Sequence, residues 1–493
     1  MNKADFLKSW RFLSLRSEEG KTFWRLGTLY LLYVIPILLA GDAYIDDLGR
    51  SIYGYLGGTN NGRPFADMVM MAVNFGKNLQ DTAPLSQLLA IGLLAYTMVL
   101  LSRRWYAPLP GTLLVPCLGL AILPPFLLEN LSYHFDAVTM MLALCLGLSC
   151  YALPEEWSRR GRFLYGVAAT FLVLGLYQAA IGAYLSMVFV EIVCTRGGGI
   201  WRRMAERFGA LLLAGALYKV MCSFVVHLDD YSGAHAQMVF PMTQEGIGIF
   251  LRNLASFGGW FGLAIASTSR VTFVVVLALL LYGLWHFHQE KRDMCYLIAL
   301  AGMLIGIVLP QLFLREPVFA ARVLISCVVL AIFLGMLLSR AIQQKRAAAL
   351  LLLPLLLSGF AGAYAYGNVL HAQSDCNRRV AQQIVSDIGQ MDPGAARNDI
   401  VIFGQAPSAR EREHAKAKRP IIVAMTPIYM NGDWMWGGIL MNHLSARDFH
   451  VIKAQEDDQA WMKAAQPCLT RDMYRIYLRD DCWIVDFAPE KRL

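Results

Sequence analysis

The sequence predicts an all-α polytopic membrane protein of about eleven transmembrane helices, followed by a small C-terminal domain of α/β or α+β type. The chain has 493 residues, of which 57% are hydrophobic and 16% are charged. A soluble globular chain carries about 25% charged residues, so this composition excludes that class. The apolar residues also come in runs of roughly 17 to 22, long enough to cross about 30 Å of hydrocarbon as helices.

Eleven apolar runs predict the spanning helices, and they divide the chain into three parts. The parts are an N-terminal segment (1–22), a membrane domain (23–366) with outer loops at 41–84 and 227–270, and a C-terminal domain (367–493). The fifth and sixth runs are short and meet at Tyr177 and Gln178, so the number is uncertain by about one. The runs cover residues 23–40, 85–101, 109–128, 135–153, 163–176, 179–194, 208–226, 271–286, 294–314, 323–338 and 347–366.

Lys and Arg are concentrated in the N-terminal segment and in alternate loops, which predicts the orientation. Because basic residues resist translocation, the N-terminus is expected in the cytoplasm and the C-terminal domain on the opposite side of the membrane. The formal net charge of +8 is explained largely by this bias, so no nucleic-acid partner is expected. Six basic residues precede or begin the first run: Lys3, Lys8, Arg11, Arg16, Lys21 and Arg25.

The outer loop at 227–270 contains a shorter pattern of its own. Large apolar side chains recur at helical spacing between Pro241 and Gly259, which predicts an amphipathic helix in the membrane interface. A packed connector would give the same pattern. The residues that form it are Ile247, Phe250, Leu251, Leu254 and Phe257.

The first outer loop carries two adjacent carboxylates, Asp46 and Asp47, close in sequence to Arg50 and Arg63. Two carboxylates so close should raise the pKa of one of them, and a base near neutrality is what removal of a hydroxyl proton requires. Asp46 is favoured as the base, with Asp47 expected to pair with Arg50. The alternative is that charges simply collect where a helix leaves the membrane.

Later outer segments add polar side chains at or near the membrane surface. His134 and Asp136 lie between two predicted helices, and Tyr177 and Gln178 form the next tight turn. Polar groups at this depth usually face a cavity, although any one of them is as well explained by a helix cap or an interhelical hydrogen bond.

A third outer loop, 314–322, has an arginine near each end. Arg315 and Arg322 offer the forked donors that bind phosphate oxygens, and a lipid phosphate reaches the membrane surface at this depth. A salt bridge to Glu316 is the alternative for either of them.

The C-terminal segment alternates helical and extended patterns, which predicts strands at 399–404, 420–425, 449–454 and in a hairpin at 474–487. Trp434 and Trp436 could offer faces for sugar stacking, although tryptophans near a membrane are often interfacial anchors. A disulfide between Cys468 and Cys482 would suit an oxidising compartment.

These motifs resemble the serotype-converting O-antigen glucosyltransferases of enterobacteria and their phages, which are polyprenyl-phosphate-sugar-dependent enzymes of the GT-C class. The resemblance covers about residues 10–366 and rests on short motifs; the C-terminal part does not match in detail. Its residues are Tyr44, Asp46 and Asp47, Arg50, the Gly62-Arg63-Pro64 turn, Tyr177-Gln178, and Arg315 to Arg322.

The resemblance implies a GT-C-like fold and transfer of a single sugar, glucose, from undecaprenyl phosphate to O-antigen lipopolysaccharide in the periplasm. With the residues above, it gives an inverting displacement in which Asp46 or Asp47 is the base. Arg315, Arg322 and Arg50 would then hold the donor phosphate. No cofactor is required, although a divalent metal at Asp46 and Asp47 is possible because carboxylate oxygens suit it.

The remaining polar residues are expected to contact the substrates. The expected substrate-binding residues are Tyr44, Arg63, His134, Asp136, Tyr177, Gln178, Trp434 and Trp436.

Two other functions are rival interpretations of the sequence. A lipid-linked sugar transporter or flippase is the first, but the sequence lacks the inverted repeat and the matched pair of broken helices typical of that class. A polysaccharide polymerase or ligase is the second, and it is distinguished by its oligosaccharide donor.

Overall fold

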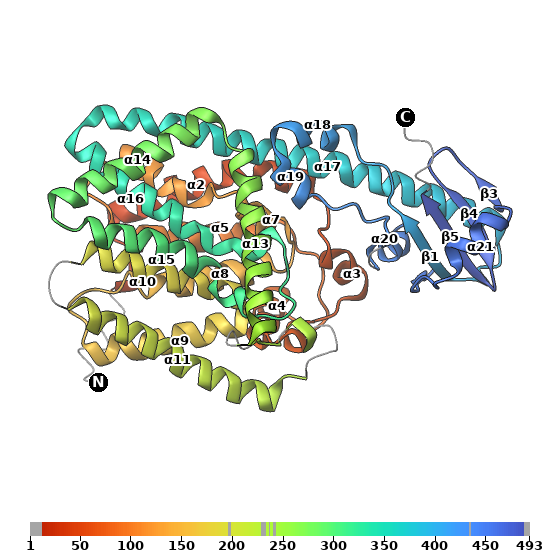
Figure 1. Ribbon diagram of the computed structural model, residues 1–493, viewed down its shortest axis with the longest axis horizontal. Coiled ribbons are helices and arrows are strands. Elements are labelled where there is room, and N and C mark those ends of the chain that lie inside the picture. Colours follow the sequence, from red (N-terminus) through yellow and green to blue (C-terminus); the bar gives the residue numbers. More distant parts are fainter. Residues whose placement is uncertain are drawn as a thin grey trace.

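The computed structural model describes residues 12–195, 199–227, 233–235, 237–239, 243–432 and 435–487. Helices run side by side through a long body, and a small sheet domain lies beyond one end of it (Figure 1). The body contains α2 (Ser17–Ala40), α3 (Asp46–Tyr53), η1 (Thr59–Asn61), α4 (Pro64–Asn74), α5 (Leu85–Trp105), α6 (Gly111–Gly119), η2 (Leu120–Ile122), α7 (Phe126–Ser132), α8 (Ala137–Ser149), α9 (Arg159–Leu176), η3 (Gln178–Ala180), α10 (Ile181–Cys194), α11 (Ile200–Val225), α13 (Gln244–Ala266), α14 (Arg270–Gln289), α15 (Asp293–Leu312), η4 (Ala321–Cys327), α16 (Val328–Gln344), η5 (Arg346–Leu351) and α17 (Leu352–Met391).

The helices confirm a multi-pass membrane protein, but not the predicted number of spans. Within the described residues, eight helices are long and apolar enough to cross a membrane, or nine if one bent pair counts as a span. All eleven predicted runs lie on helices, but α8 and the η3–α10 unit are shorter than a usual span. One of the eight qualifying helices is α13, which the sequence predicted as an interfacial helix.

The orientation of α13 explains this difference. In Figure 1, α13 crosses the body at a steep angle to α14 and α15, whereas those helices run along it. Phe257 is buried against Phe319, with ring centroids 5.2 Å apart, while Ile247 and Leu251 are exposed. One face of α13 therefore packs against the helical body and the other is exposed.

The bent pair consists of α6 with η2 and α7, which are inclined to each other by 78°. Pro124 and Pro125 fall between them. Proline removes a backbone donor and clashes with the preceding turn, so the break is attributed to this pair. The break makes α7 a separate short helix.

Small residues let α10 and α15 approach closely. Gly182 and Ser186 on α10 face Gly306 on α15, and a Cβ at Gly306 would lie 3.0 Å from the Ser186 backbone nitrogen. The Ser186 hydroxyl also donates to the carbonyl of Met303 at 2.9 Å. This is the small-residue packing that drives helix association in lipid, where the hydrophobic effect is absent.

The helical body and the C-terminal domain each have a hydrophobic core, and α17 joins the two. α17 is one helix of 40 residues, about 60 Å long, and it runs continuously through the predicted domain boundary at 366/367. Its first half packs on α2, and its last turns, including Ala381 and Ile384, pack beneath the sheet with Ile400 and Val485. The helix therefore connects the sheet domain directly to the membrane domain.

The sheet has the strand order β2-β1-β5-β4-β3, in which β1 is parallel to β2 and β5 and the remaining pairs are antiparallel. This mixed sheet with flanking helices confirms the small α/β or α+β domain. Its elements are β1 (Asp399–Gly404), α18 (Arg410–Lys418), α19 (Pro420–Met425), α20 (Trp436–Leu444), β2 (His450–Val451), α21 (Asp458–Ala464), β3 (Leu469–Thr470), β4 (Arg475–Arg479) and β5 (Cys482–Phe487).

Two predictions for this domain were wrong. The segment 420–425 forms the helix α19 rather than a strand, because Pro420 occupies the first helical position and Ile421, Ile422 and Met425 are buried at helical spacing. The disulfide is absent as well: Cys468 and Cys482 are both free, and Cys482 in β5 pairs across the hairpin with Arg479. Strand β2 is also shorter than predicted.

Replacing Gly306 with leucine should destabilise the fold, because the new side chain would be forced into the α10 backbone at a cost of about 1–3 kcal/mol. We expect a clearly lower apparent melting temperature in detergent than for the wild type. Gly215→Leu on α11 is the control, since no heavy atom lies within 4 Å of a Cβ there. Equal melting temperatures for the two variants would contradict this packing.

Candidate functional site

The short helix α3, which begins with the paired carboxylates, is held between the membrane domain and the C-terminal domain. The Tyr44 hydroxyl donates to the carbonyl of Met425 at 2.7 Å, and the Tyr429 hydroxyl accepts from the N–H of Ile45 at 3.0 Å. Leu48 packs in the core of the C-terminal domain. Figure 1 shows α3 on the side of the body that faces α20. Both domains therefore fix the position of the carboxylates.

The backbone immediately before the pair is strained. Ile45 has φ of 50° and ψ of −104°, a conformation that a β-branched residue rarely adopts. Such conformations persist only where surrounding contacts impose them, and they cluster at functional sites. Here the contacts are those of Tyr44 and Tyr429, so the C-terminal domain helps to impose the turn that aims Asp46.

Asp47 is the buried member of the pair, and its side chain organises the backbone. It is 0% exposed, and its carboxylate accepts from the N–H groups of Tyr44 at 3.2 Å, His134 at 2.8 Å and Phe135 at 3.4 Å. Burial raises the pKa of Asp47 to about 7, against the opposing influence of His134 and Arg50. Its oxygens are engaged in joining the first outer loop to the turn between α7 and α8.

Asp46 is the available member of the pair. Its side chain is only partly buried, and within the described part of the chain no hydrogen bond or ion pair to its carboxylate is seen. Burial raises the pKa of Asp46 above its ordinary value of 3.8, while the charges of Arg50 and Arg322 oppose the rise. A partly desolvated carboxylate with a raised pKa and free oxygens suits a general base.

Arg50 pairs with Asp136, not with Asp47 as predicted. The guanidinium bonds the Asp136 carboxylate directly, and both side chains are largely buried. Burial lowers the pKa of Arg50, but the negative charges of Asp136 and Asp46 have the larger effect, so the pKa of Arg50 is raised overall. The reason is spatial: Arg50 lies one helical turn after Asp46 on the same face of α3, whereas Asp47 points into the backbone turn at 134–135.

His134 is paired with Asp81, a residue that the sequence analysis did not single out. Its Nδ1 lies 2.7 Å from the Asp81 carboxylate. Burial lowers the pKa of His134, but the hydrogen bond to Asp81 and the charge of Asp47 raise it overall. For Asp81, burial raises the pKa, but the hydrogen bond to His134 has the opposite effect, and the pKa of Asp81 lies below its ordinary value overall. The pair stiffens the turn on which Asp47 depends.

Arg322 is close enough to influence the charge of Asp46, and it is held by Glu129. Its guanidinium donates to Glu129 Oε1 at 3.0 Å, and its backbone N–H donates to Glu129 Oε2 at 2.7 Å. It also lies over the ring of Tyr133, 5.6 Å from the centroid. The Arg322 side chain is nevertheless 23% exposed, and Glu129 binds its guanidinium through Nη1 alone.

Three buried polar atoms near these arginines have no hydrogen-bond partner among the described residues: Arg50 Nε, Asn130 Oδ1 and Tyr133 Oη. Asn130 donates to the carbonyl of Arg322, and Tyr133 lies under the Arg322 guanidinium. A buried polar atom without a partner is costly, and a bound ligand or water is one way to satisfy it. These atoms support the choice of this cluster as the candidate site.

Arg63, Tyr177 and Gln178 close the site on a third side. Arg63 Nε donates to Gln178 Oε1 at 3.0 Å, and its guanidinium lies 5.0 Å from the Tyr177 ring centroid. The Tyr177 hydroxyl donates to the carbonyl of Arg322 at 3.1 Å. Gln178 in turn donates to the hydroxyl of Tyr218. The tight turn that the sequence placed here thus joins two of the arginines.

Two other predicted residues lie outside this cluster, and Trp434 falls outside the described residues. Arg315 forms its ion pair with Glu245 at the start of α13, at 2.6 Å, rather than with Glu316, and its side chain is 51% exposed. Trp436 begins α20 and is half-buried against the core of the C-terminal domain. Trp436 thus belongs to an element that packs on α3, and sugar stacking there remains a prediction.

No group of three or more His, Cys, Asp or Glu side chains that could hold a metal ion occurs in the part of the chain that the structure describes. The Asp47 carboxylate accepts three backbone N–H groups, two at Oδ2 and one at Oδ1. A metal at this pair stays a prediction.

The sequence model of the glucosyl transferase GtrII family matches residues 35–333. The chain belongs to this family. Membership makes it a membrane glycosyltransferase and confirms the resemblance recognised from its motifs. The match covers every residue of the cluster around Asp46, from Tyr44 to Arg322, and ends before the C-terminal domain.

A relative from Salmonella phage P22 matches more of the chain. It is described as an uncharacterized 55.3 kDa protein in the gtrB 5′ region, and it is 25% identical over 454 residues, which are 88% of this chain and 93% of the relative. No solved structure matches. Family membership favours an enzyme over the transporter interpretation, since the family is named for sugar transfer.

Three residues that contact the candidate site were missed by the sequence analysis. Glu129, Asp81 and Tyr218 were not among the predicted site residues. Tyr218 lies among apolar residues of α11, where a polar side chain facing inward is itself a signal of a site. Asp81 carries no such signal, because an acidic residue in an outer loop is ordinary.

Replacing Asp47 with alanine should destabilise the protein, because it leaves three backbone N–H groups without their acceptor, at a cost of about 1–3 kcal/mol. Asp46→Ala should leave the apparent melting temperature nearly unchanged, since no N–H group loses a partner. Thermal unfolding in detergent compares the two variants. An equal loss in both would contradict the division of roles within the pair.

Proposed function

We propose that this GtrII-family protein transfers a single sugar, glucose, from undecaprenyl phosphate to O-antigen lipopolysaccharide on the periplasmic side of the inner membrane. The observation that carries the proposal is the juxtaposition of one available carboxylate, Asp46, with the arginines Arg50, Arg63 and Arg322. A transferase with a lipid-phosphate donor requires these two functions side by side, a base for the acceptor and cations for the leaving phosphate.

In the proposed reaction, a hydroxyl oxygen of the acceptor attacks the anomeric carbon of the donor sugar. Asp46 accepts the hydroxyl proton as the new carbon–oxygen bond forms. The bond from the anomeric carbon to the phosphate oxygen breaks, and polyprenyl phosphate leaves with the electron pair. A single displacement of this kind inverts the configuration at the anomeric carbon, because no covalent carboxylate intermediate forms.

The leaving phosphate gains negative charge, and Arg322 is the residue best placed to stabilise it. Glu129 holds its backbone and one side of its guanidinium, so the remaining donors are oriented before the substrate arrives. Arg63, stacked on Tyr177, supports the same charge from the next element. Arg315, paired with Glu245, is assigned a smaller part in binding the donor.

Asp46→Asn should reduce transfer by about 10²-fold or more, because asparagine cannot accept the proton. Arg322→Ala should cost a similar factor, and Arg315→Ala should cost less. The measurement is transfer of radiolabelled glucose from undecaprenyl-phosphate glucose to O-antigen in membranes, with protein amounts matched by immunoblot. Full activity of Asp46→Asn would rule out this base.

The proposed base also predicts a pH dependence. Burial raises the pKa of Asp46 above 3.8, and only the ionised carboxylate accepts a proton. The kcat/KM of the wild type should therefore fall as the pH is lowered, starting at a higher pH than for an ordinary aspartate. The residual activity of Asp46→Asn should lack this acidic limb. An unchanged limb in that variant would assign it to another group.

A further inference from the structure

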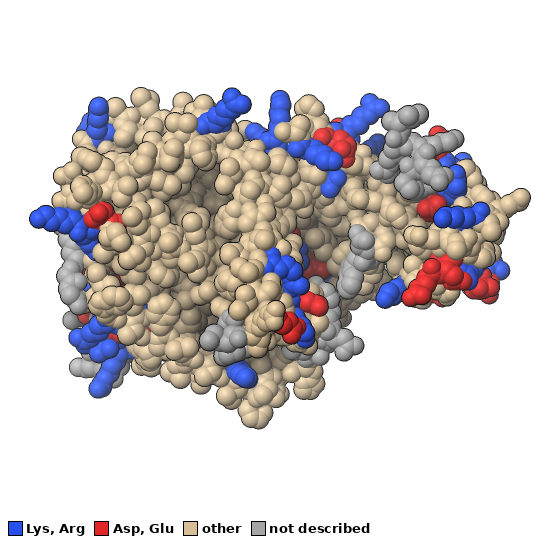
Figure 2. All heavy atoms as spheres, viewed as in Figure 1, with Lys and Arg blue, Asp and Glu red and all other residues tan. Residues whose placement is uncertain are grey.

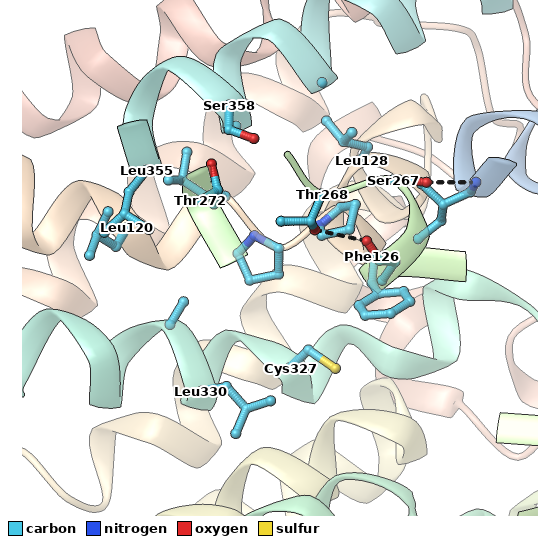
Figure 3. A pocket seen from close by; sticks show the side chains of 18 of the residues that line it. Leu120, Phe126, Leu128, Ser267, Thr268, Thr272, Cys327, Leu330, Leu355 and Ser358 are labelled. Atoms are coloured by element: carbon cyan, nitrogen blue, oxygen red, sulfur yellow. Dashed lines mark hydrogen bonds between the residues drawn. The ribbon is translucent and has the colours of Figure 1, made fainter. Parts of the chain in front are cut away.

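A largely apolar cavity of about 340 Å³ lies inside the helical body, away from the carboxylate pair. This size is within the range of about 300–1,000 Å³ found for small-molecule sites. Figure 3 shows Thr272, Leu355 and Ser358 on one side of it and Cys327 and Leu330 on the other. The break between η2 and α7 lines it too, so the wall is made from helices that the prolines at 124–125 splay apart.

Two elements of the wall lead directly to Arg322. On α7, Leu128 lines the cavity, and the next residue, Glu129, binds the Arg322 guanidinium. On η4, Cys327 lines the cavity five residues after Arg322, which corresponds to about 10 Å at the rise of a 3₁₀-helix. Arg322 and its partner Glu129 therefore lie on the same two elements that form part of the cavity wall.

The C-terminal domain supplies another part of the wall. Arg419, Ile421 and Ile422 of the α19 region line the cavity. The N–H of Ile421 donates to the Ser267 hydroxyl at 3.1 Å, and the Arg419 guanidinium donates to the carbonyl of Ala361. These bonds attach α19 to the end of α13 and to α17, so its place over the cavity is fixed by contacts on two sides.

Resting on the proposed lipid-phosphate donor, we infer that this cavity holds the isoprenoid units nearest the donor phosphate, and that α19 forms part of the donor-binding site. The lining is largely apolar, as a branched hydrocarbon chain requires. Two cations accompany it, Arg419 in the wall and Arg322 on the adjoining η4, and a guanidinium complements a phosphate. An acyl chain of a phospholipid shares this chemistry and is the occupant that the experiment must distinguish.

Gly362 offers a way to fill the cavity without disturbing its wall. It lines the cavity on α17, and no heavy atom lies within 4 Å of a Cβ built there. Gly362→Phe therefore places a ring in the space, and Ser358→Phe, one turn earlier on the same wall, is the second filling variant. Gly389→Phe is the matched control, because it lies on the same helix, is equally open and is not among the cavity-lining residues.

Binding of undecaprenyl phosphate, without sugar, to the full-length protein in nanodiscs is measured by native mass spectrometry, with phosphatidylglycerol as the second lipid. We expect both filling variants to weaken undecaprenyl phosphate binding at least about tenfold, the loss that follows when about two methylene groups are no longer buried. Gly389→Phe and phosphatidylglycerol binding should be unchanged. Unchanged undecaprenyl phosphate binding in both filling variants, or an equal loss of phosphatidylglycerol, would overturn the inference.

The part assigned to α19 has its own measurement. An undecaprenyl phosphate analogue with a diazirine on the isoprene units next to the phosphate should label peptides that contain Ile421 and Ile422. Labelling confined to other segments would contradict it. Neither experiment requires sugar transfer, so lipid binding in the cavity by a protein that transfers no glucose would refute the proposed function and leave this inference standing.

Discussion

The buried carboxylate of Asp47 is the interaction on which the rest of the site depends. By accepting N–H groups from Tyr44 and from the turn at His134 and Phe135, it joins the first outer loop to the end of the broken helix pair. That joint places Asp46 on the exposed side of α3 and brings Arg50 to Asp136. One aspartate thus has a structural role that leaves its neighbour free for chemistry, a division that the sequence Asp-Asp alone does not reveal.

The C-terminal domain is part of the same arrangement and does not simply follow the membrane domain. α17 carries it on a continuous helix, Tyr429 and Met425 hold the strained turn before Asp46, and α19 covers the apolar cavity. The surface is hollowed between the body and the sheet domain, and acidic side chains are visible within the hollow, while the middle of the helical body shows few charges (Figure 2). An acceptor entering this hollow would meet both domains at once.

Sequence patterns predicted the features that depend on local composition. The apolar runs, a helix in the segment of α13, strand β1 and the hairpin of β4 and β5 follow from hydrophobic periodicity, and they agree with the structure. The pairing of charges did not follow: Arg50 was assigned to Asp47 because they are close in sequence, but Asp136, distant in sequence, is its partner. Likewise α19 was predicted as a strand, because a short apolar run carries no period that separates strand from helix until its packing is known. Long-range contacts decide such cases, and a single sequence does not encode them visibly.

The most direct test of the account is the structure of the protein bound to a non-transferable phosphonate analogue of undecaprenyl-phosphate glucose, determined by cryo-electron microscopy. The account predicts the phosphonate in contact with the Arg322 guanidinium and the Asp46 carboxylate on the opposite face of the sugar ring, as an inverting displacement requires. A phosphonate bound beside Arg315 and Glu245, with Asp46 remote from the sugar, would contradict it.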